Sequence, residues 1–243
     1  MREAPQTTTT MTFNQVLKTL ESQADPAAVL GMARFGITAA KAFGWSTPAL
    51  KKLAREIGKD HALAERLWST GILEARYLAA MVADRQCVSE RLMDEWVKDF
   101  DSWAVCDGTC LNLFRYLPFA YQKCREWSGR REEFVKRAAF ALMACLAVGD
   151  KAAPDRTFLR LLPLIKREAT DERNYVRKAV NWALRQIGKR NRRLNRAAIE
   201  VAERIHELDS PAARWIASDA LRELRSRAVE RRLKKSSSSP QRH

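Results

Sequence analysis

Four segments of this chain resemble one another, and each has the apolar spacing of an amphipathic helix. They read LEARYLAAM, FVKRAAFAL, YVRKAVNWAL and AARWIASDAL. A cation recurs in them at one register, as Arg76, Arg137, Lys178 and Arg214. Such self-similarity is typical of helical repeats, in which each unit buries its apolar face only by stacking on its neighbours. We therefore expect a stack of helices.

The spacing of these segments favours one architecture. The recurring cations are 61, 41 and 36 residues apart, and the last two steps are close to the roughly 40 residues of HEAT-type repeats. Runs of β-branched residues with a period of two are scarce, while Ala, Leu, Arg and Glu dominate. We expect an all-α fold, a HEAT-like helical-repeat solenoid whose inner helices line a concave, basic face.

The chain divides into one expected domain and two tails. Residues 1–11 are polar, with four threonines in a row, and 232–243 are basic and rich in Ser, so both are expected to be disordered. A single helical domain is expected over 12–231. Within it, the apolar pattern predicts, among others, helices over 89–103, 109–117, 155–168 and 211–231.

The formal net charge of +15 points to an acidic partner. From Asp171 to the end of the chain, 19 Lys and Arg face 9 Asp and Glu. Such an excess is typical of nucleic-acid binding and, less often, of binding to acidic membranes. No apolar run approaches the roughly 20 residues of a membrane helix, and the N-terminus has no apolar signal region. We therefore expect DNA as the partner and no membrane association.

Cysteine usage favours reduced thiols in a cytosol. Five cysteines occur without an export signal, and Cys106 and Cys110 form one C-x3-C pair with no partner pair. The three histidines are scattered along the chain. We therefore expect neither a metal site nor a cofactor.

The stretch NYVRKAVNWALRQIGKRN, residues 174–191, has two contrasting helical faces. One face holds an ordinary apolar stripe. The opposite face holds two aromatic rings among cations and amides, in Asn174, Tyr175, Lys178, Asn181, Trp182, Arg185 and Lys189. Rings and cations together suit a ligand with phosphates and flat, electron-poor rings. The alternative is that Trp182 lies under a neighbouring helix, covered by the stems of arginines.

The recurring cations have the same two readings. They could form a positive track for phosphates along the inner helices, or each could pair with a carboxylate between repeats. Four residues after each cation, three repeats carry a small residue and one carries Trp182. This exception favours a functional role for Trp182.

Residues 89–110 hold a second candidate site. Trp103 shares a helical face with Trp96 and Phe100, so by itself it is typical of a core. Asp107 follows Trp103 by four residues, beside Gly108. The plain alternative for Asp107 is the N-cap of the next helix.

These motifs resemble a known family. NYVRKAVNWALRQIGKRN, FDSWAVCD and EEFVKRAAFAL are similar to segments of the bacterial HEAT-like DNA alkylation repair glycosylases of the AlkD type, and the resemblance runs from about Phe35 to Leu224. It implies a catalytic cleft of two tryptophans and an aspartate, with a helical arginine nearby. The matching positions here are Trp103, Trp182, Asp107 and Arg137. Arg185 matches a DNA-contacting arginine of the family.

The resemblance implies an activity, excision of N3- or N7-alkylated purines from duplex DNA. Such a base is cationic, and cleavage of its glycosidic bond builds positive charge on the sugar, which a carboxylate stabilises. The further DNA contacts expected are from Tyr175, Lys178, Lys189, Arg76 and Arg214. We expect a monomeric protein of the bacterial cytoplasm, associated with the nucleoid when bound to DNA.

One residue departs from the family pattern. The family usually has Asp directly after the first Trp, and this chain has Ala104. Some branches of the superfamily bind DNA without excising bases. A non-catalytic binder of damaged or structured DNA is therefore the main alternative, and a HEAT-type scaffold for an acidic protein is the third.

Overall fold

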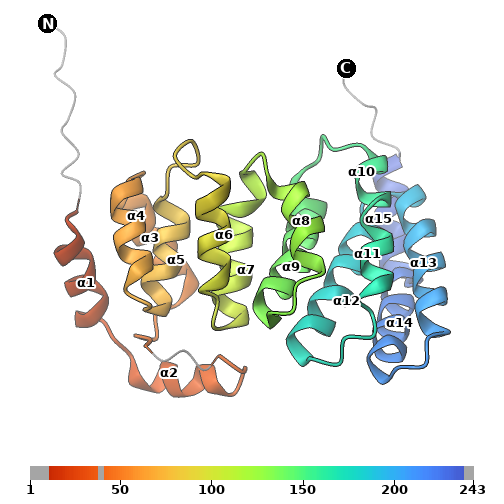
Figure 1. Cartoon of the computed structure of the whole chain (residues 1–243), viewed down its shortest axis with the longest axis horizontal. Coiled ribbons are helices and arrows are strands. Elements are labelled where there is room, and N and C mark those ends of the chain that lie inside the picture. Colours follow the sequence, from red (N-terminus) through yellow and green to blue (C-terminus); the bar gives the residue numbers. More distant parts are fainter. Residues whose placement is uncertain (1–10, 38–40, 238–243) are drawn as a thin grey trace, which may run out of the picture. The chain divides into compact units, whose positions relative to one another are not determined.

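The computed structural model describes residues 11–37 and 41–237, and every regular element in them is a helix (Figure 1). The helices pack into two compact units that divide between Ser89 and Glu90. The first residues expected to be disordered, 1–10, and the last part of the tail, 238–243, lie outside the described residues. The organisation into one domain over 12–231 stays a prediction.

The first unit holds five helices among its described residues, and the first four begin with a side-chain cap. They are α1 (Phe13–Ser22), α2 (Pro26–Ala33), α3 (Thr47–Ile57), α4 (His61–Ser69) and α5 (Leu73–Val82). The carboxylate of Asp60 caps α4 by accepting from the backbone N–H of Leu63 at 2.8 Å. The buried carboxylate of Glu74 in α5 accepts from the N–H groups of Phe43 and Gly44 at 2.9 and 2.8 Å, which fixes the loop before α3.

The second unit is organised around α9, which is buried on almost every side. Helix α9 packs against α7, α8 and α12, and α12 packs in turn against α13 and α14. The elements are α6 (Glu90–Lys98), α7 (Trp103–Asn112), the 3-10 turn η1 (Phe114–Tyr116), α8 (Ala120–Ser128), α9 (Glu133–Gly149), α10 (Asp155–Leu159), α11 (Leu162–Arg167), α12 (Asn174–Gly188), α13 (Arg192–His206), α14 (Pro211–Leu224) and α15 (Arg227–Ser237). Three of the four segments that resemble one another in sequence thus lie in α9, α12 and α14, and the first, LEARYLAAM, lies in α5 of the first unit.

Several predicted helix boundaries were wrong. At α7 the reason is the N-cap formed by Ser102, which outweighed the apolar pattern. The chain leaves the helix after Lys98, and Ser102 caps a new helix. Helix α7 therefore begins at the last residue of the predicted helix 89–103 and runs into the predicted helix 109–117. The segment 155–168 divides into α10 and α11 before Pro163, and 211–231 divides into α14 and α15. Helix α15 extends to Ser237, into the expected tail, because its own residues Val229 and Leu233 are buried and hold it against the unit.

Gly188 allows α12, α13 and α14 to meet closely. A Cβ atom at this position would lie 2.7 Å from Leu224 Cδ2 and 2.9 Å from Ala198 Cβ. Both distances are far inside normal van der Waals contact, so a side chain here forces the helices apart.

We therefore expect Gly188→Ala to lower the free energy of unfolding by about 1–3 kcal/mol, as overpacking does in other cores. Urea unfolding monitored by circular dichroism measures this change. Gly129→Ala is the matched control, because its nearest atom is the flexible end of Arg167 at 3.6 Å. Equal stability of Gly188→Ala and the parent protein would contradict the close packing described here.

Candidate nucleic-acid interface

Helix α7 presents Trp103 and Asp107 on one side. The hydroxyl of Ser102 caps the helix by accepting from the N–H of Val105 at 3.4 Å, which makes Trp103 the first helical residue. Asp107 lies one turn further on, about 40° around the helix axis from Trp103. Both side chains are half-buried. The alternative of Asp107 as an N-cap is wrong, because Asp107 lies inside the helix and Ser102 is the cap.

Asp107 forms a two-pronged ion pair with Arg137 of α9. The Arg137 Nε donates to Asp107 Oδ1 at 3.0 Å, and Nη2 donates to Oδ2 at 2.7 Å. A third donor, Arg137 Nη1, reaches the backbone oxygen of Tyr175 in α12 at 2.6 Å. The planar guanidinium thus fixes the carboxylate and connects three helices.

The two members of this pair differ in exposure. Arg137 is buried, whereas the side chain of Asp107 is 20% exposed, so Asp107 is the member of the pair that solvent can approach. Burial raises the pKa of Asp107, and the Arg137 guanidinium opposes that rise. Burial also opposes the charge of Arg137, but the Asp107 carboxylate outweighs it and raises the pKa of Arg137. The guanidinium is therefore permanently charged, and the site joins a fixed cation to a partly accessible carboxylate.

Helix α12 places three predicted residues along one strip. Tyr175, Lys178 and Trp182 follow one another at spacings of three and four residues, and Trp182 lies about 10.5 Å along the axis from Tyr175. The ring of Tyr175 stacks at 5.5 Å on Phe134 of α9, which the sequence analysis did not single out. Lys178 is exposed, and Trp182 is half-buried. With the Gln186 amide oxygen turned toward it, the Trp182 indole N–H donates at 3.2 Å.

Comparison with known proteins identifies the family. The family described as DNA alkylation repair enzyme matches residues 16–224, which is most of the chain. The chain belongs to this family. DNA repair is thus its setting, and DNA is the partner expected from the charge. No curated protein matches the chain.

Solved structures support the fold of this DNA alkylation repair family member. One match is described as "A new family of proteins related to the HEAT-like repeat DNA glycosylases with affinity for branched DNA structures", at 21% identity and a TM-score of 0.72, covering 86% of this chain and 94% of that chain. Two designed armadillo repeat proteins, one in complex with a (KR)4 peptide, match at 16% and 14% identity with TM-scores of 0.37 and 0.39, covering 78% and 89% of this chain and 80% and 96% of theirs. The all-α, HEAT-like repeat fold expected from the sequence is thereby confirmed.

Two cations of the predicted track pair with carboxylates of the next repeat. Arg185 Nη1 lies 2.5 Å from Glu223 Oε2 and 3.6 Å from Asp219 Oδ2, and Lys189 Nζ lies 2.5 Å from Glu223 Oε1. Burial favours a neutral Glu223, but the hydrogen bonds from Lys189 and Arg185 outweigh it and lower the pKa of Glu223. In the absence of DNA, Arg185 and Lys189 thus pair with a carboxylate of the neighbouring repeat, as Arg137 does with Asp107.

The two outermost predicted cations differ in surroundings. Arg76 lies in α5 of the first unit, with its guanidinium carbon 5.4 Å from the ring centre of Trp68. Arg214 lies at the start of α14 and is half exposed, 3.2 Å from the exposed Asp209. Lys178 is the exposed cation of α12 for which the described residues provide no carboxylate.

Several contributors were missed because their role depends on tertiary contact. Asp219 and Glu223 follow Trp215 at four-residue spacing on α14, and this row faces α12. Trp215 lies under the guanidinium of Arg177 at 5.2 Å, and Asp219 accepts from Asn181 at 2.7 Å. The four-residue spacing was visible in the sequence, but only the packing of α14 on α12 shows what the row contacts.

An acidic cluster on α6 and α8 has an internal counter-ion. Glu90, Asp94 and Glu126 lie close enough together to resemble a cation site. The buried Lys123 Nζ lies 2.8, 2.6 and 2.7 Å from their respective oxygens. The ammonium group thus already satisfies the carboxylates, and the cluster stabilises α6 against α8.

We expect Lys178→Ala to weaken binding to duplex DNA evenly across sequences. The slope of log K against log[salt] should become shallower by about one, because one phosphate contact is lost. Fluorescence anisotropy over a range of salt concentrations measures the slope. Arg204→Ala, which removes an exposed cation from α13, is the matched control. A slope unchanged in Lys178→Ala would place the phosphate contacts on another face.

Proposed function

We propose that this protein is a DNA glycosylase that excises N3- or N7-alkylated, positively charged purines from duplex DNA by hydrolysis of the N-glycosidic bond. It acts as a monomer, without a cofactor or metal. The observation that carries this proposal is the carboxylate of Asp107, which is partly exposed, one helical turn from Trp103, and held in place by Arg137. Membership in a DNA alkylation repair family supports it.

The proposed chemistry needs a fixed anion rather than a strong acid. An alkylated purine is already a cationic leaving group, so breaking its bond to C1′ leaves positive charge on the deoxyribose. The carboxylate of Asp107 stabilises this charge and orients the attacking water. Since Arg137 donates to both oxygens, the water and the sugar meet the lone pairs on the exposed edge.

Arg137 is a positioning residue in this scheme. Its third hydrogen bond, to the Tyr175 backbone oxygen, sets the distance between α9 and α12 and so the place of Trp182 relative to α9. The indole faces of Trp103 and Trp182 attract the cationic base and sugar, at about 0.5–2 kcal/mol each.

The proposed DNA track follows α12 and α14 of the second unit. Lys178 contacts a phosphate directly, with Tyr175 beside it. Arg185 and Lys189 reach phosphates by exchanging Glu223 for the DNA backbone, and Arg214 extends the track. Arg76 is a separate proposed DNA contact of the first unit. Because ion pairs to Glu223 are replaced by contacts to phosphates, we expect the affinity for DNA to depend strongly on the salt concentration.

A second candidate function is binding of damaged or structured DNA without excision. Two observations favour it. The charge of Asp107 is matched by Arg137, which reduces the field available to a developing cation. Ala104, which stands where the family usually has Asp, is buried in the core, so no second carboxylate faces the cleft from this position.

Base release from methylated DNA separates the two candidates. DNA treated with a methylating agent is incubated with the protein, and the freed bases are resolved by chromatography. We expect release of 7-methylguanine and 3-methyladenine, which are cationic in DNA, but no release of the uncharged O6-methylguanine. Tight binding with no freed base would establish the second candidate.

A further inference from the structure

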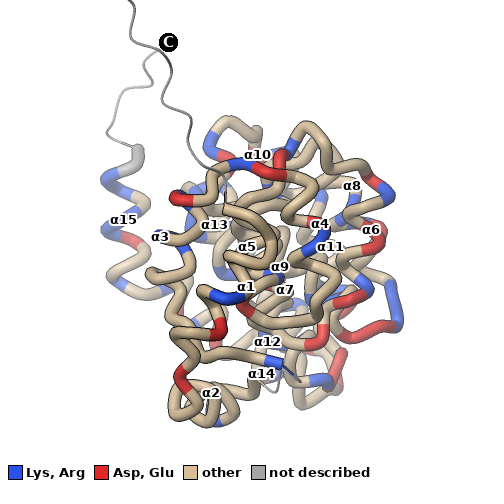
Figure 2. Tube along the Cα trace, turned by 90° about the vertical axis from the view of Figure 1, so that its left-hand side faces the viewer, with Lys and Arg blue, Asp and Glu red and all other residues tan. Residues whose placement is uncertain are grey.

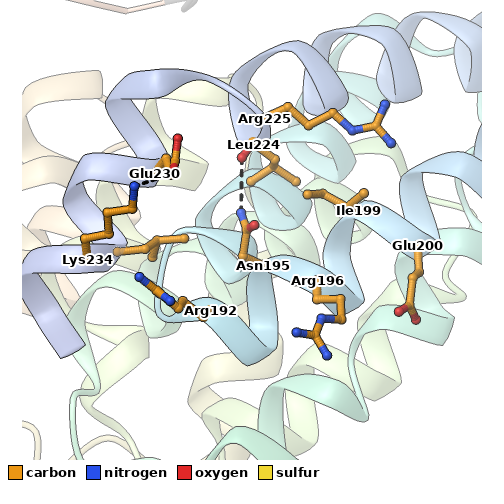
Figure 3. Close-up of a pocket in the computed structure, with 10 residues that line it drawn as sticks. Arg192, Asn195, Arg196, Ile199, Glu200, Leu224, Arg225, Glu230 and Lys234 are labelled. Carbon is orange, nitrogen blue, oxygen red and sulfur yellow. Dashed lines mark hydrogen bonds and ion pairs between the residues drawn. The ribbon is translucent and has the colours of Figure 1, made fainter.

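The second unit holds a pocket between α13, the end of α14 and α15. Its volume is ≈ 510 Å³, within the range of small-molecule sites. Figure 3 shows Arg192 and Arg196 on its α13 side and Glu230 and Lys234 on its α15 side. None of the residues proposed above to contact the lesion lines this pocket.

Cations outnumber carboxylates in the lining of the pocket, and two of these cations, Arg192 and Arg196, form no ion pair among the described residues. Arg192 and Arg196 lie one turn apart on the same side of α13, and both are exposed. Neither of them forms an ion pair with a carboxylate in the described part of the chain, although the charge of Arg192 helps to lower the pKa of Glu230 and Glu200 follows Arg196 by one turn. The other two cations are occupied, since Lys234 lies 2.6 Å from Glu230 and Arg225 pairs with Glu203.

The remaining wall is aliphatic and anchored. Ile199, Leu224 and Leu233 supply apolar surface. Asn195 holds the base of the pocket by donating to the backbone oxygens of Gly188 and Leu224 at 3.1 and 3.3 Å. The pocket thus offers an apolar wall, fixed by Asn195, next to the two exposed guanidinium groups of Arg192 and Arg196.

The surroundings add to the attraction for an anion. Arg192 is the first residue of α13, a helix of 15 residues, so the positive end of its dipole lies at this edge of the pocket. The charged positions of helix α15 are mainly basic (Figure 2), and the sequence places Arg227, Arg231 and Arg232 on it. A ligand with a phosphate and a less polar body fits this combination.

We propose that this pocket binds a nucleoside monophosphate group, either as a free nucleotide or as the 5′-phosphorylated end of a DNA strand. Arg192 and Arg196 hold the phosphate through their two-pronged donors. The sugar and base lie against Ile199, Leu224 and Leu233. The site is separate from lesion excision and does not depend on it.

Calorimetric titration with deoxyadenosine 5′-monophosphate tests the proposal, with deoxyadenosine and inorganic phosphate as parallel probes. We expect the nucleotide to bind with a stoichiometry of about one and deoxyadenosine not to bind. The double variant Arg192→Ala/Arg196→Ala should bind at least about tenfold more weakly. The double variant Arg193→Ala/Arg204→Ala is the matched control, since it removes two exposed cations of α13 that do not line the pocket. The control should stay within about twofold of the parent protein.

A second measurement identifies the source of the phosphate. Oligonucleotides labelled at the 3′ end, with either a 5′-phosphate or a 5′-hydroxyl group, are compared by anisotropy. Preference for the 5′-phosphate, lost in Arg192→Ala/Arg196→Ala, assigns the pocket to strand ends, and nucleotide binding without this preference assigns it to free nucleotides. Absence of both effects, an equal loss in the control variant, or saturable binding of an Asp–Leu repeat peptide in place of the nucleotide overturns the proposal.

Discussion

Replacing Arg137 by Ala is expected to lower the free energy of unfolding by about 3–5 kcal/mol, because it leaves the half-buried carboxylate of Asp107 without its counter-charge. Asp107 loses both of its guanidinium hydrogen bonds, and the Tyr175 backbone oxygen loses a third. Urea unfolding at neutral pH measures the change.

The pH dependence of this variant has a definite sign. Burial raises the pKa of Asp107, and without Arg137 nothing in the pair opposes the rise. A group whose folded pKa is raised stabilises the protein below its unfolded pKa, about 3.9 for Asp, and loses that stabilisation as the pH rises through the folded value. The destabilisation of Arg137→Ala should therefore be largest at neutral pH and shrink toward pH 4.

The double variant Arg137→Met/Asp107→Leu is the control for an ion-pair effect. It removes both charges, so it should recover much of the stability lost in Arg137→Ala. If Arg137→Ala unfolds at the same urea concentration as the parent protein, the pair does not hold α7 to α9.

The largest effect on activity is expected for Asp107→Asn. Removing the charge should slow single-turnover base excision by about 100-fold or more, which corresponds to a few kcal/mol of transition-state stabilisation. Binding to duplex DNA with an abasic-site analogue should survive, because the proposed phosphate contacts lie outside α7.

Loss of stability must be separated from loss of chemistry in this variant. Asn retains an acceptor for Arg137, but the guanidinium loses its counter-charge, so some destabilisation is expected. Ile205→Ala, a cavity variant in the core of α13, provides a folded protein of reduced stability with an intact site. If Asp107→Asn excises bases as fast as Ile205→Ala, Asp107 has no catalytic role.

The repeat architecture was predictable because it rests on a periodic signal. The recurring segments lie in α5, α9, α12 and α14, and the apolar stripe of residues 174–191 is buried as its spacing required. The break before Trp103 was not predictable from the stripe alone. Trp96 and Phe100 continue the apolar pattern, and only the capping by Ser102 ends it.

The sequence named candidate site residues, but it did not predict which of them contact one another. Arg137 was named from the register of the recurring cations and from the family resemblance, and in the structure it pairs with Asp107, another candidate residue. The pairing of Arg185 and Lys189 with Glu223 was open, because a sequence does not tell whether a cation on a repeat faces the next repeat or the ligand.

The most direct test of the account is single-turnover excision from a duplex that contains one 7-methylguanine, with the protein in excess over DNA. Spontaneous loss of the base from the same duplex without protein gives the reference rate. We predict release of free 7-methylguanine well above that rate, leaving an abasic site. Tight binding of this duplex with release at the spontaneous rate would contradict the account and make the protein a binder of damaged DNA.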